Sequence, residues 1–261
     1  MKLHNSVVKR VWIIAIDPSG VRCENSEESN PLRKGTMNPG RLETESADYR
    51  KVRDELLEAE IALKDQRERV AALRRKLPLD TEIQAYEFHE GPADLTKDGP
   101  FPAVRLSELF DDPAKPLVVY QYMYGAAQKR PCPSCTMWVD GFNGVSHHLR
   151  QTMNFAIIAQ AGIRQFREWG RERDWQALRL VSSEGTDFKS VLNFQDGEGK
   201  QRPGLSVFKR SPDGSVKHFY SASAHMTDEV KTRGIDLLSP VWNLLDITPD
   251  GRGQWEPKLK Y

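Results

Sequence analysis

The sequence predicts an α/β fold, a mixed sheet flanked by helices and preceded by a long N-terminal amphipathic helix. Two observations support this prediction. From residue 116 onward, short apolar runs rich in β-branched and aromatic residues alternate with amphipathic stretches, which is the order of strands joined by helices. Before that point, residues 47–77 follow a helical period instead.

The first 45 residues differ from the rest because polar and turn-forming residues dominate them. Proline, glycine, asparagine and serine recur there, as in the runs 18–20 and 37–40. We therefore interpret residues 1–45 as an irregular or disordered extension. Within it, Cys23 is interpreted as a free thiol without a role.

Residues 46–78 predict one long helix. Its apolar residues recur at alternating intervals of four and three, with Gln66 in the one polar slot: Val52, Leu56, Ala59, Leu63, Val70, Leu73 and Leu77. Ser46 is a suitable N-cap, and Pro78 follows the last apolar residue. Two interpretations of this seam stay open. It packs on the body of the same chain, or it pairs with a second copy to form a homodimer.

Residues 79–252 predict the folded body, and residues 253–261 a C-terminal tail. The first part, 79–115, is interpreted as a connector with Gly-Pro turns and one short helix at 104–110. The elements predicted after it are strands at 116–124, 154–160 and 178–182, helices at 132–151, 163–175 and 235–245, and a hairpin formed by 205–210 and 216–221.

Charge and hydropathy exclude several classes of protein. Lys and Arg total 38 against 37 for Asp and Glu, so the overall charge gives no reason to expect a nucleic-acid or anionic-membrane partner. No apolar run approaches the ~18 residues of a membrane span. The early run 11–16 is too short for a signal peptide. A cytoplasmic location is therefore predicted, and three cysteines are too few for a secreted disulfide scaffold.

The segment with the clearest chemistry is Cys132-Pro-Ser-Cys135. A Cys-x-x-Cys pair beside a βαβ pattern is typical of a thioredoxin-like redox site. The predicted strand and loop deliver Cys132 to a helix N-terminus, where free N–H groups and the helix dipole stabilise a thiolate. Lys129 and Arg130 are expected to lower its pKa further. Cys132 would then be the exposed nucleophile and Cys135 the buried resolving thiol.

Three alternatives to a redox pair remain. A structural zinc site needs two further ligands, and His147 and His148 lack the usual spacing for them. The two thiols could also be buried and inert. A peroxidase-like single nucleophile usually has a hydroxyl residue three positions before it, where this chain has Lys129. We expect neither a metal nor a cofactor.

Three further residues are candidates for substrate binding. Pro203 precedes a predicted strand, where thioredoxin-like folds place a cis-proline opposite the Cys-x-x-Cys pair; an ordinary turn proline is the alternative. Pro133 fits the first helical turn, where its missing N–H costs nothing. Trp138 lies one turn after Cys135, although a tryptophan there is more often a core residue.

Several motifs resemble one bacterial family: Cys132-Pro-Ser-Cys-Thr-Met-Trp138, Pro203-Gly-Leu-Ser-Val-Phe208 and Leu245-Asp-Ile-Thr-Pro249. It is the thioredoxin-like family catalogued as domain of unknown function number 899, also described as predicted dithiol–disulfide isomerases. The resemblance covers roughly residues 47–252 and implies a thioredoxin-like fold and a dithiol reaction. It supplies no known substrate. Segment 189–201 is shorter than is usual in the family, and 222–232 resembles an insertion.

The sequence therefore predicts a thiol–disulfide oxidoreductase. Its partner would be a disulfide-bearing protein or a small thiol. The alternative is a non-catalytic thioredoxin-like module that binds a partner or ligand and dimerises through the 47–77 helix. The reactivity of Cys132 toward an alkylating reagent distinguishes the two.

Overall fold

The computed structural model describes residues 42–226 and 233–261. The predicted extension lies almost entirely outside these residues, as does Cys23, and the predicted insertion lies partly outside them. The chain divides into two compact units, Met1–Leu63 and Lys64–Tyr261. The second unit contains the sheet and both cysteines of the Cys-x-x-Cys pair.

The predicted long helix is present as α1, Ala47–Arg74. Ser46 caps it as expected, because its hydroxyl accepts a hydrogen bond from the backbone N–H of Tyr49 at 3.1 Å. Within the described chain, α1 buries none of its own residues. The role of its apolar seam therefore stays a prediction. No described helix is both long enough and apolar enough to cross a membrane.

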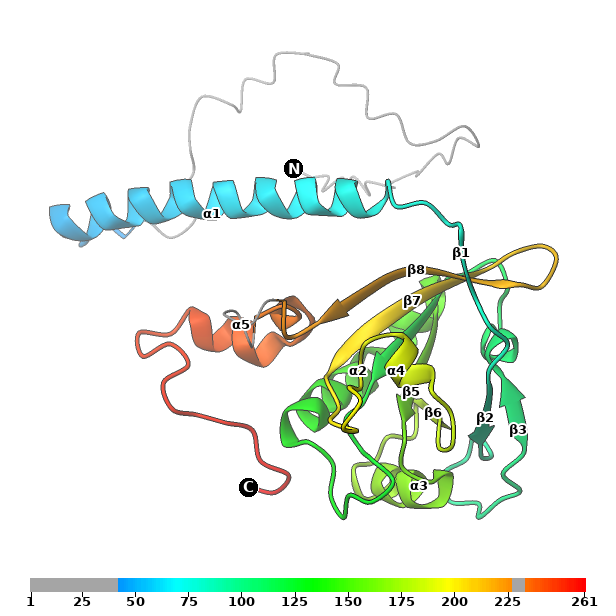
Figure 1. Cartoon of the computed structure of the whole chain (residues 1–261). Coiled ribbons are helices and arrows are strands. Elements are labelled where there is room, and N and C mark those ends of the chain that lie inside the picture. Colours follow the sequence, from blue (N-terminus) through cyan, green and yellow to red (C-terminus); the bar gives the residue numbers. More distant parts are fainter. Residues whose placement is uncertain (1–41, 227–232) are drawn as a thin grey trace, which may run out of the picture. The chain divides into compact units, whose positions relative to one another are not determined.

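The body is built on a mixed eight-stranded sheet in the order β1-β8-β7-β4-β5-β6-β2-β3 (Figure 1). The strands are β1 Thr81–Ile83, β2 Glu87–Glu90, β3 Ala103–Arg105, β4 Leu117–Gln121, β5 Asn154–Ala159, β6 Arg179–Ser182, β7 Gly204–Arg210 and β8 Val216–Ser223. The pairs β4–β5 and β5–β6 are parallel. The hairpin β7–β8 joins β4 in the antiparallel direction.

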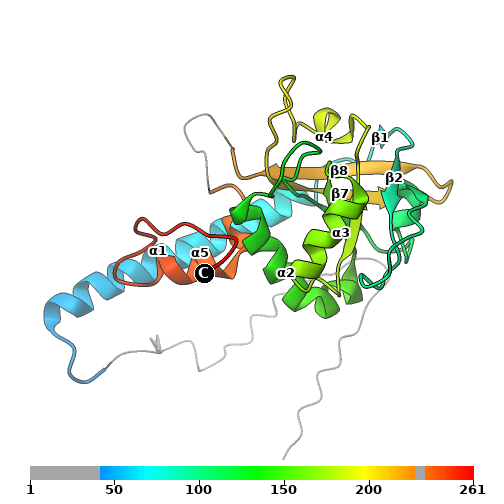
Figure 2. The same cartoon turned by 90° about the horizontal axis from the view of Figure 1, so that it is seen from below.

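The helices cover both faces of this sheet. They are η2 Leu106–Leu109, α2 Pro133–Thr152, α3 Ile163–Glu172, α4 Phe188–Val191, η3 Asp236–Leu238 and α5 Pro240–Asp246. Helices α2 and α3 connect the parallel strands and lie side by side on one face, with α4 on the other (Figure 2). Two parallel crossovers followed by an antiparallel hairpin beside the first strand form a thioredoxin-like fold, which confirms the predicted fold class.

The core has two layers because the central strands are buried on both faces. Along β5, Ile157 and Ala159 belong to the cluster under α2 and α3, whereas Ala156 and Ile158 belong to the cluster under η2 and α4. This alternation follows from the period of two along a strand. It also explains why β4 and β5 are continuous apolar runs in the sequence.

Two segments differ from the prediction. The connector 79–115 contributes the three strands β1, β2 and β3, and the helix expected at 104–110 is β3 followed by the 3-10 turn η2. These strands have only three or four residues and partly polar sequences, so they lack a clear periodic signal. The closing helix is also interrupted, because Pro240 holds Ser239 in extended backbone (φ −116°, ψ 119°) between η3 and α5.

Candidate active site

Cys132 lies where the chain passes from β4 into α2. It is the N-cap residue of α2, in extended backbone with φ −65° and ψ 126°. Its N–H donates to the carbonyl of Met123 at 3.1 Å, which ties the start of the helix to the segment following β4. Pro133 occupies the first helical turn, as predicted, and is exposed. The strand, loop and helix thus place Cys132 at the expected helix N-terminus.

The two cysteines have opposite environments. Both are free thiols; Cys132 is half-buried and Cys135 is fully buried. Hydrogen bonds from the Cys135 thiol and from the backbone N–H groups of Cys135 and Ser134 lower the pKa of Cys132 to about 6, against the opposing effect of burial. Burial raises the pKa of Cys135 well above its usual range. At neutral pH, the charge therefore resides on Cys132.

The thiolate is stabilised mainly by the second thiol and, as expected, by the helix N-terminus. Lys129 and Arg130 are exposed, and they are not among the groups that shift the pKa of Cys132 most. Solvent screens a charge on an exposed, flexible side chain, whereas the helix N–H groups are fixed beside the sulfur. The further lowering expected from Lys129 and Arg130 is therefore not among the main effects on Cys132.

A buried hydrogen-bond network holds the first turn of α2 against the sheet. Thr136 donates through Oγ1 to the carbonyl of Cys132 at 2.9 Å and lies 2.7 Å from the hydroxyl of Tyr122. The indole of Trp169, on α3, donates to the same Tyr122 oxygen at 3.0 Å. Tyr122 must then donate to Thr136. The chain of contacts from α3 through Tyr122 and Thr136 fixes the position of Cys132.

Tyr120 lies beside the buried thiol. Its side chain is fully buried, and its hydroxyl has no hydrogen-bond partner of N or O among the described residues. Burial and, to a smaller extent, the charge on Cys135 raise the pKa of Tyr120, whereas contact with Tyr120 acts to lower the pKa of Cys135. The sequence analysis placed Tyr120 in a buried strand but assigned it no role at the thiols.

The three predicted substrate-binding residues differ in exposure, since Pro133 is exposed whereas Pro203 and Trp138 are buried. Pro203 is buried and directly precedes Gly204, which pairs with Gln121 at the end of β4. It therefore lies at the same edge of the sheet as Cys132, which follows β4. The Arg202–Pro203 bond is trans. Trp138 is only 4% exposed and lies in the core cluster with Cys135.

Sequence reasoning missed Lys189. This lysine, on α4, is fully buried. Its Nζ donates to the carbonyl of Tyr122 at 2.7 Å and to Oε1 of Gln201 at 2.9 Å. Burial lowers the pKa of Lys189 to about 7, while the charge on Cys135 acts to raise it. No spacing or motif indicates a buried amine at this position, because a single lysine after a strand is usually solvated.

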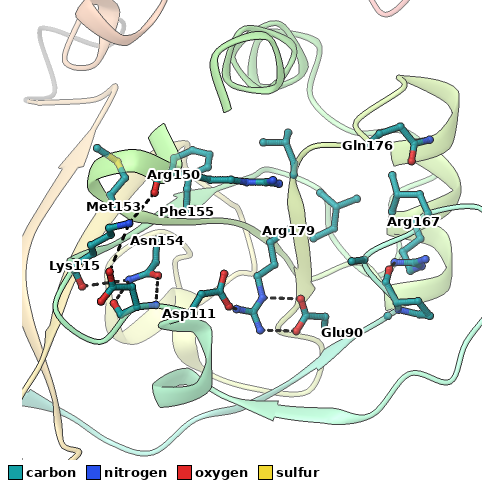
Figure 3. Close-up of a pocket in the computed structure, with 17 residues that line it drawn as sticks. Glu90, Asp111, Lys115, Arg150, Met153, Asn154, Phe155, Arg167, Gln176 and Arg179 are labelled. Carbon is teal, nitrogen blue, oxygen red and sulfur yellow. Dashed lines mark hydrogen bonds and ion pairs between the residues drawn. The ribbon is translucent and has the colours of Figure 1, made fainter. Parts of the chain in front are cut away.

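A large cavity lies elsewhere, at the amino ends of the parallel strands (Figure 3). It measures about 670 Å³, and Asn154 and Arg179, which open β5 and β6, line it. Its charges are largely paired with one another, since Arg179 forms ion pairs with Glu90 at 2.6 Å and with Asp111 at 3.0 Å. The cysteines follow the opposite, carboxyl end of β4, so this cavity does not belong to the thiol site.

The described residues contain no group of three or more His, Cys, Asp or Glu side chains arranged to hold a metal ion. His147 and His148 lie against each other on α2, with ring centroids 3.9 Å apart, and both are exposed. They are not joined to the cysteines in such a group. The zinc alternative therefore gains no support from this part of the chain.

Comparison with known proteins gives one family. The family described as "Bacterial protein of unknown function (DUF899)" matches residues 40–261. Among curated proteins, none matches the chain.

Several solved structures are similar at low identity. The Plasmodium falciparum antioxidant protein, a 1-Cys peroxiredoxin, is 12% identical with a TM-score of 0.47, covering 65% of this chain and 99% of that one. Peroxidoxin BcpB from Mycobacterium tuberculosis is 20% identical with a TM-score of 0.37, covering 53% and 83%. AhpC from Enterococcus faecalis is 12% identical with a TM-score of 0.42, covering 57% and 81%. At these values, nothing about activity carries over from them.

Proposed function

The chain belongs to the DUF899 family of bacterial proteins, whose description assigns no reaction. From the site itself, we propose that the protein carries out thiol–disulfide exchange through Cys132 and Cys135. The observation that carries the proposal is the contrast between the two thiols. One is half-buried at a helix N-terminus with its pKa lowered to about 6, and the other is buried three residues later with its pKa raised. A nucleophile and a resolving thiol require this division.

The proposed reaction has two steps. The Cys132 thiolate attacks one sulfur of a substrate disulfide, so a Cys132–substrate disulfide forms and the substrate S–S bond breaks. The other substrate sulfur leaves as a thiolate and takes a proton from water. Cys135, once ionised, then attacks Sγ of Cys132, and the second substrate sulfur leaves while the Cys132–Cys135 disulfide forms. Each cycle oxidises the protein dithiol by two electrons, and the reduction potential decides which direction prevails.

The substrate in this proposal is a disulfide-bearing protein or a small thiol in its disulfide form. Pro133 would contact the chain that carries the disulfide, because it is exposed and adjoins Cys132. Pro203, which is buried at the same edge of the sheet, would shape the docking surface from beneath. Trp138 would support the site from the core, where it packs with Cys135. The proposed location is the cytoplasm.

The pH dependence of Cys132 alkylation tests this function. With Cys23→Ser removing the third cysteine of the chain, the rate with iodoacetamide should rise through a midpoint near pH 6, because only the thiolate reacts and its pKa is about 6. An unperturbed cysteine has its midpoint near pH ~8.5. Mass spectrometry of the labelled peptide assigns the reacting residue. Cys132→Ser is the control and should remove the reaction, and a midpoint above pH 8 would contradict the proposal.

A second candidate function is a non-catalytic interaction or ligand-binding module dimerised through α1. The observation that favours it is the exposure of the apolar seam, since Val52, Leu56 and Leu63 are 63%, 49% and 59% exposed. A second copy of α1 would cover these side chains in a coiled coil. A dimer by sedimentation, together with an unreactive Cys132, would favour this alternative over the oxidoreductase.

A further inference from the structure

Lys189 carries the only large pKa shift of a lysine among the described residues, and it is fully buried. Its Nζ donates to the carbonyl of Tyr122, and the Met123 N–H of the same peptide unit donates to Cys135, so one peptide group joins the amine to the buried thiol. Lysine is almost never fully buried unless its charge is paired. Within the described residues, Lys189 forms no ion pair with a carboxylate. Its two hydrogen-bond acceptors, the Tyr122 carbonyl and the Gln201 side-chain amide, are both neutral. The structure thus holds a buried amine whose positive form lacks a partner charge.

The hydrogen bonds of Nζ fit a neutral amine. A neutral amine has two N–H donors and one lone pair, whereas an ammonium has three donors. Two acceptors are present, at 2.7 and 2.9 Å, and the described residues offer no third. Gln201 is held in turn, because its Nε2 donates to Oε1 of Gln160 at 3.1 Å. The lone pair therefore remains available for a proton.

The ionisable groups near this amine come from α2 and from β4 with its extension. Cys135 of α2 is the group whose charge acts on Lys189. Tyr120 and Tyr122 are the titratable side chains of the β4 segment, and burial raises the pKa of each above its usual value. No carboxylate shifts the pKa of Lys189, so the Cys135 thiolate is the negative charge that this lysine can balance.

We propose that Lys189 takes up the proton of Cys135 in the resolving step and balances the buried thiolate with its ammonium. This inference rests on the proposed exchange function. The transfer converts one thiol and one amine into one thiolate and one ammonium, so the net charge of the core does not change. When Cys135 then bonds to Cys132, the thiolate charge leaves with the substrate sulfur, and Lys189 returns its proton to solvent. Lys189 is a positioning residue, since it acts on the substrate only through Cys135.

The test separates the two chemical steps. In a Cys23→Ser background, the protein is mixed with an aromatic disulfide that releases a coloured thiolate, once on attack by Cys132 and again on resolution by Cys135. Lys189→Gln, which keeps an N–H donor for the two acceptors but has no basic nitrogen, should slow the second release at pH 7 at least tenfold. The first release should keep its rate, which also shows that the fold is intact. Lys189→Met serves as a second variant with a different shape.

The pH profile distinguishes proton transfer from a purely structural role. With Lys189 present, the second release should level off above about pH 7–8, as the amine becomes neutral and available. In Lys189→Gln, it should continue to rise about tenfold per pH unit, as expected for direct ionisation of a high-pKa thiol. Lys200→Met, which removes an exposed charge from the same segment, is the matched control and should resemble the parent.

Three results have distinct meanings. If the parent never shows a second release, the exchange function itself fails, and the role of Lys189 fails with it. If the parent resolves and both Lys189 variants match it in rate and pH profile, the inference about Lys189 alone is overturned. A slow, steadily rising second release in Lys189→Gln, with the first release unchanged, supports the inference.

Discussion

Replacing Cys132 with serine is expected to slow the reaction with an aromatic disulfide roughly 100-fold at pH 7. The remaining thiol of the pair, Cys135, has its pKa raised well above 9, so less than about 1% of it is ionised at that pH. It is also fully buried, which limits access by the reagent. The colour released over time, in a Cys23→Ser background, measures the effect.

Replacing Cys135 with serine should have a different result. Cys132 still attacks, so one equivalent of coloured thiolate is released, but the mixed disulfide then persists because no second thiol resolves it. Intact-mass measurement would detect the trapped adduct. Two equivalents released by Cys135→Ser, or an unchanged rate in Cys132→Ser, would contradict the assigned order of the two cysteines.

Replacing Gly204 with alanine is expected to destabilise the fold by about 2 kcal/mol, within the range for overpacking a core. Gly204 opens β7, where a Cβ would overlap a ring carbon of Phe194 and the carbonyl oxygen of Ala222 on β8. A backbone carbonyl cannot move aside without disturbing the hairpin. For a chain of this length, the corresponding fall in Tm is about 4–8 °C, measured by calorimetry.

Gly144→Ala is the matched control for this substitution. Gly144 lies in α2, and nothing else in the described chain comes within 4 Å of the position of an added Cβ. Because glycine is a poor helix former, alanine here should stabilise the protein by roughly 0.5–1 kcal/mol. Opposite signs for the two substitutions support the packing described for β7 and β8. Equal effects would mean that the hairpin does not approach Gly204 as closely as described.

The position of Cys132 at the start of α2 was predictable because it depends on local sequence. A buried strand, a loop and a helix beginning at Cys132-Pro133 are each specified within about ten residues, and they place Cys132 at the N-terminus of α2 as expected. The burial of Cys135 follows from the same spacing, because it is one helical turn further on. The central strands were predictable for a related reason, since burial on both faces requires uninterrupted apolar runs.

What the sequence does not indicate depends on contacts between distant segments. Lys189 donates a hydrogen bond to the carbonyl of Tyr122, which lies 67 residues away in the sequence. No local sequence pattern predicts a contact between segments so far apart. The connector strands β1, β2 and β3 have only three or four residues each, too few to show a periodic pattern. Their pairing with neighbouring strands holds them in the sheet. Lys129 and Arg130 are not among the groups that shift the pKa of Cys132 most, because both are exposed and sequence spacing does not give exposure.

The reduction potential of the Cys132–Cys135 pair tests the central claim most directly. The protein is equilibrated with glutathione buffers of graded potential, and free thiols are then alkylated and counted by mass. The proposed function predicts a reversible two-electron couple between about −120 and −270 mV, the range of disulfide-exchange proteins. If no Cys132–Cys135 disulfide forms at any potential in the series, the pair is not a redox couple and the proposed function is wrong.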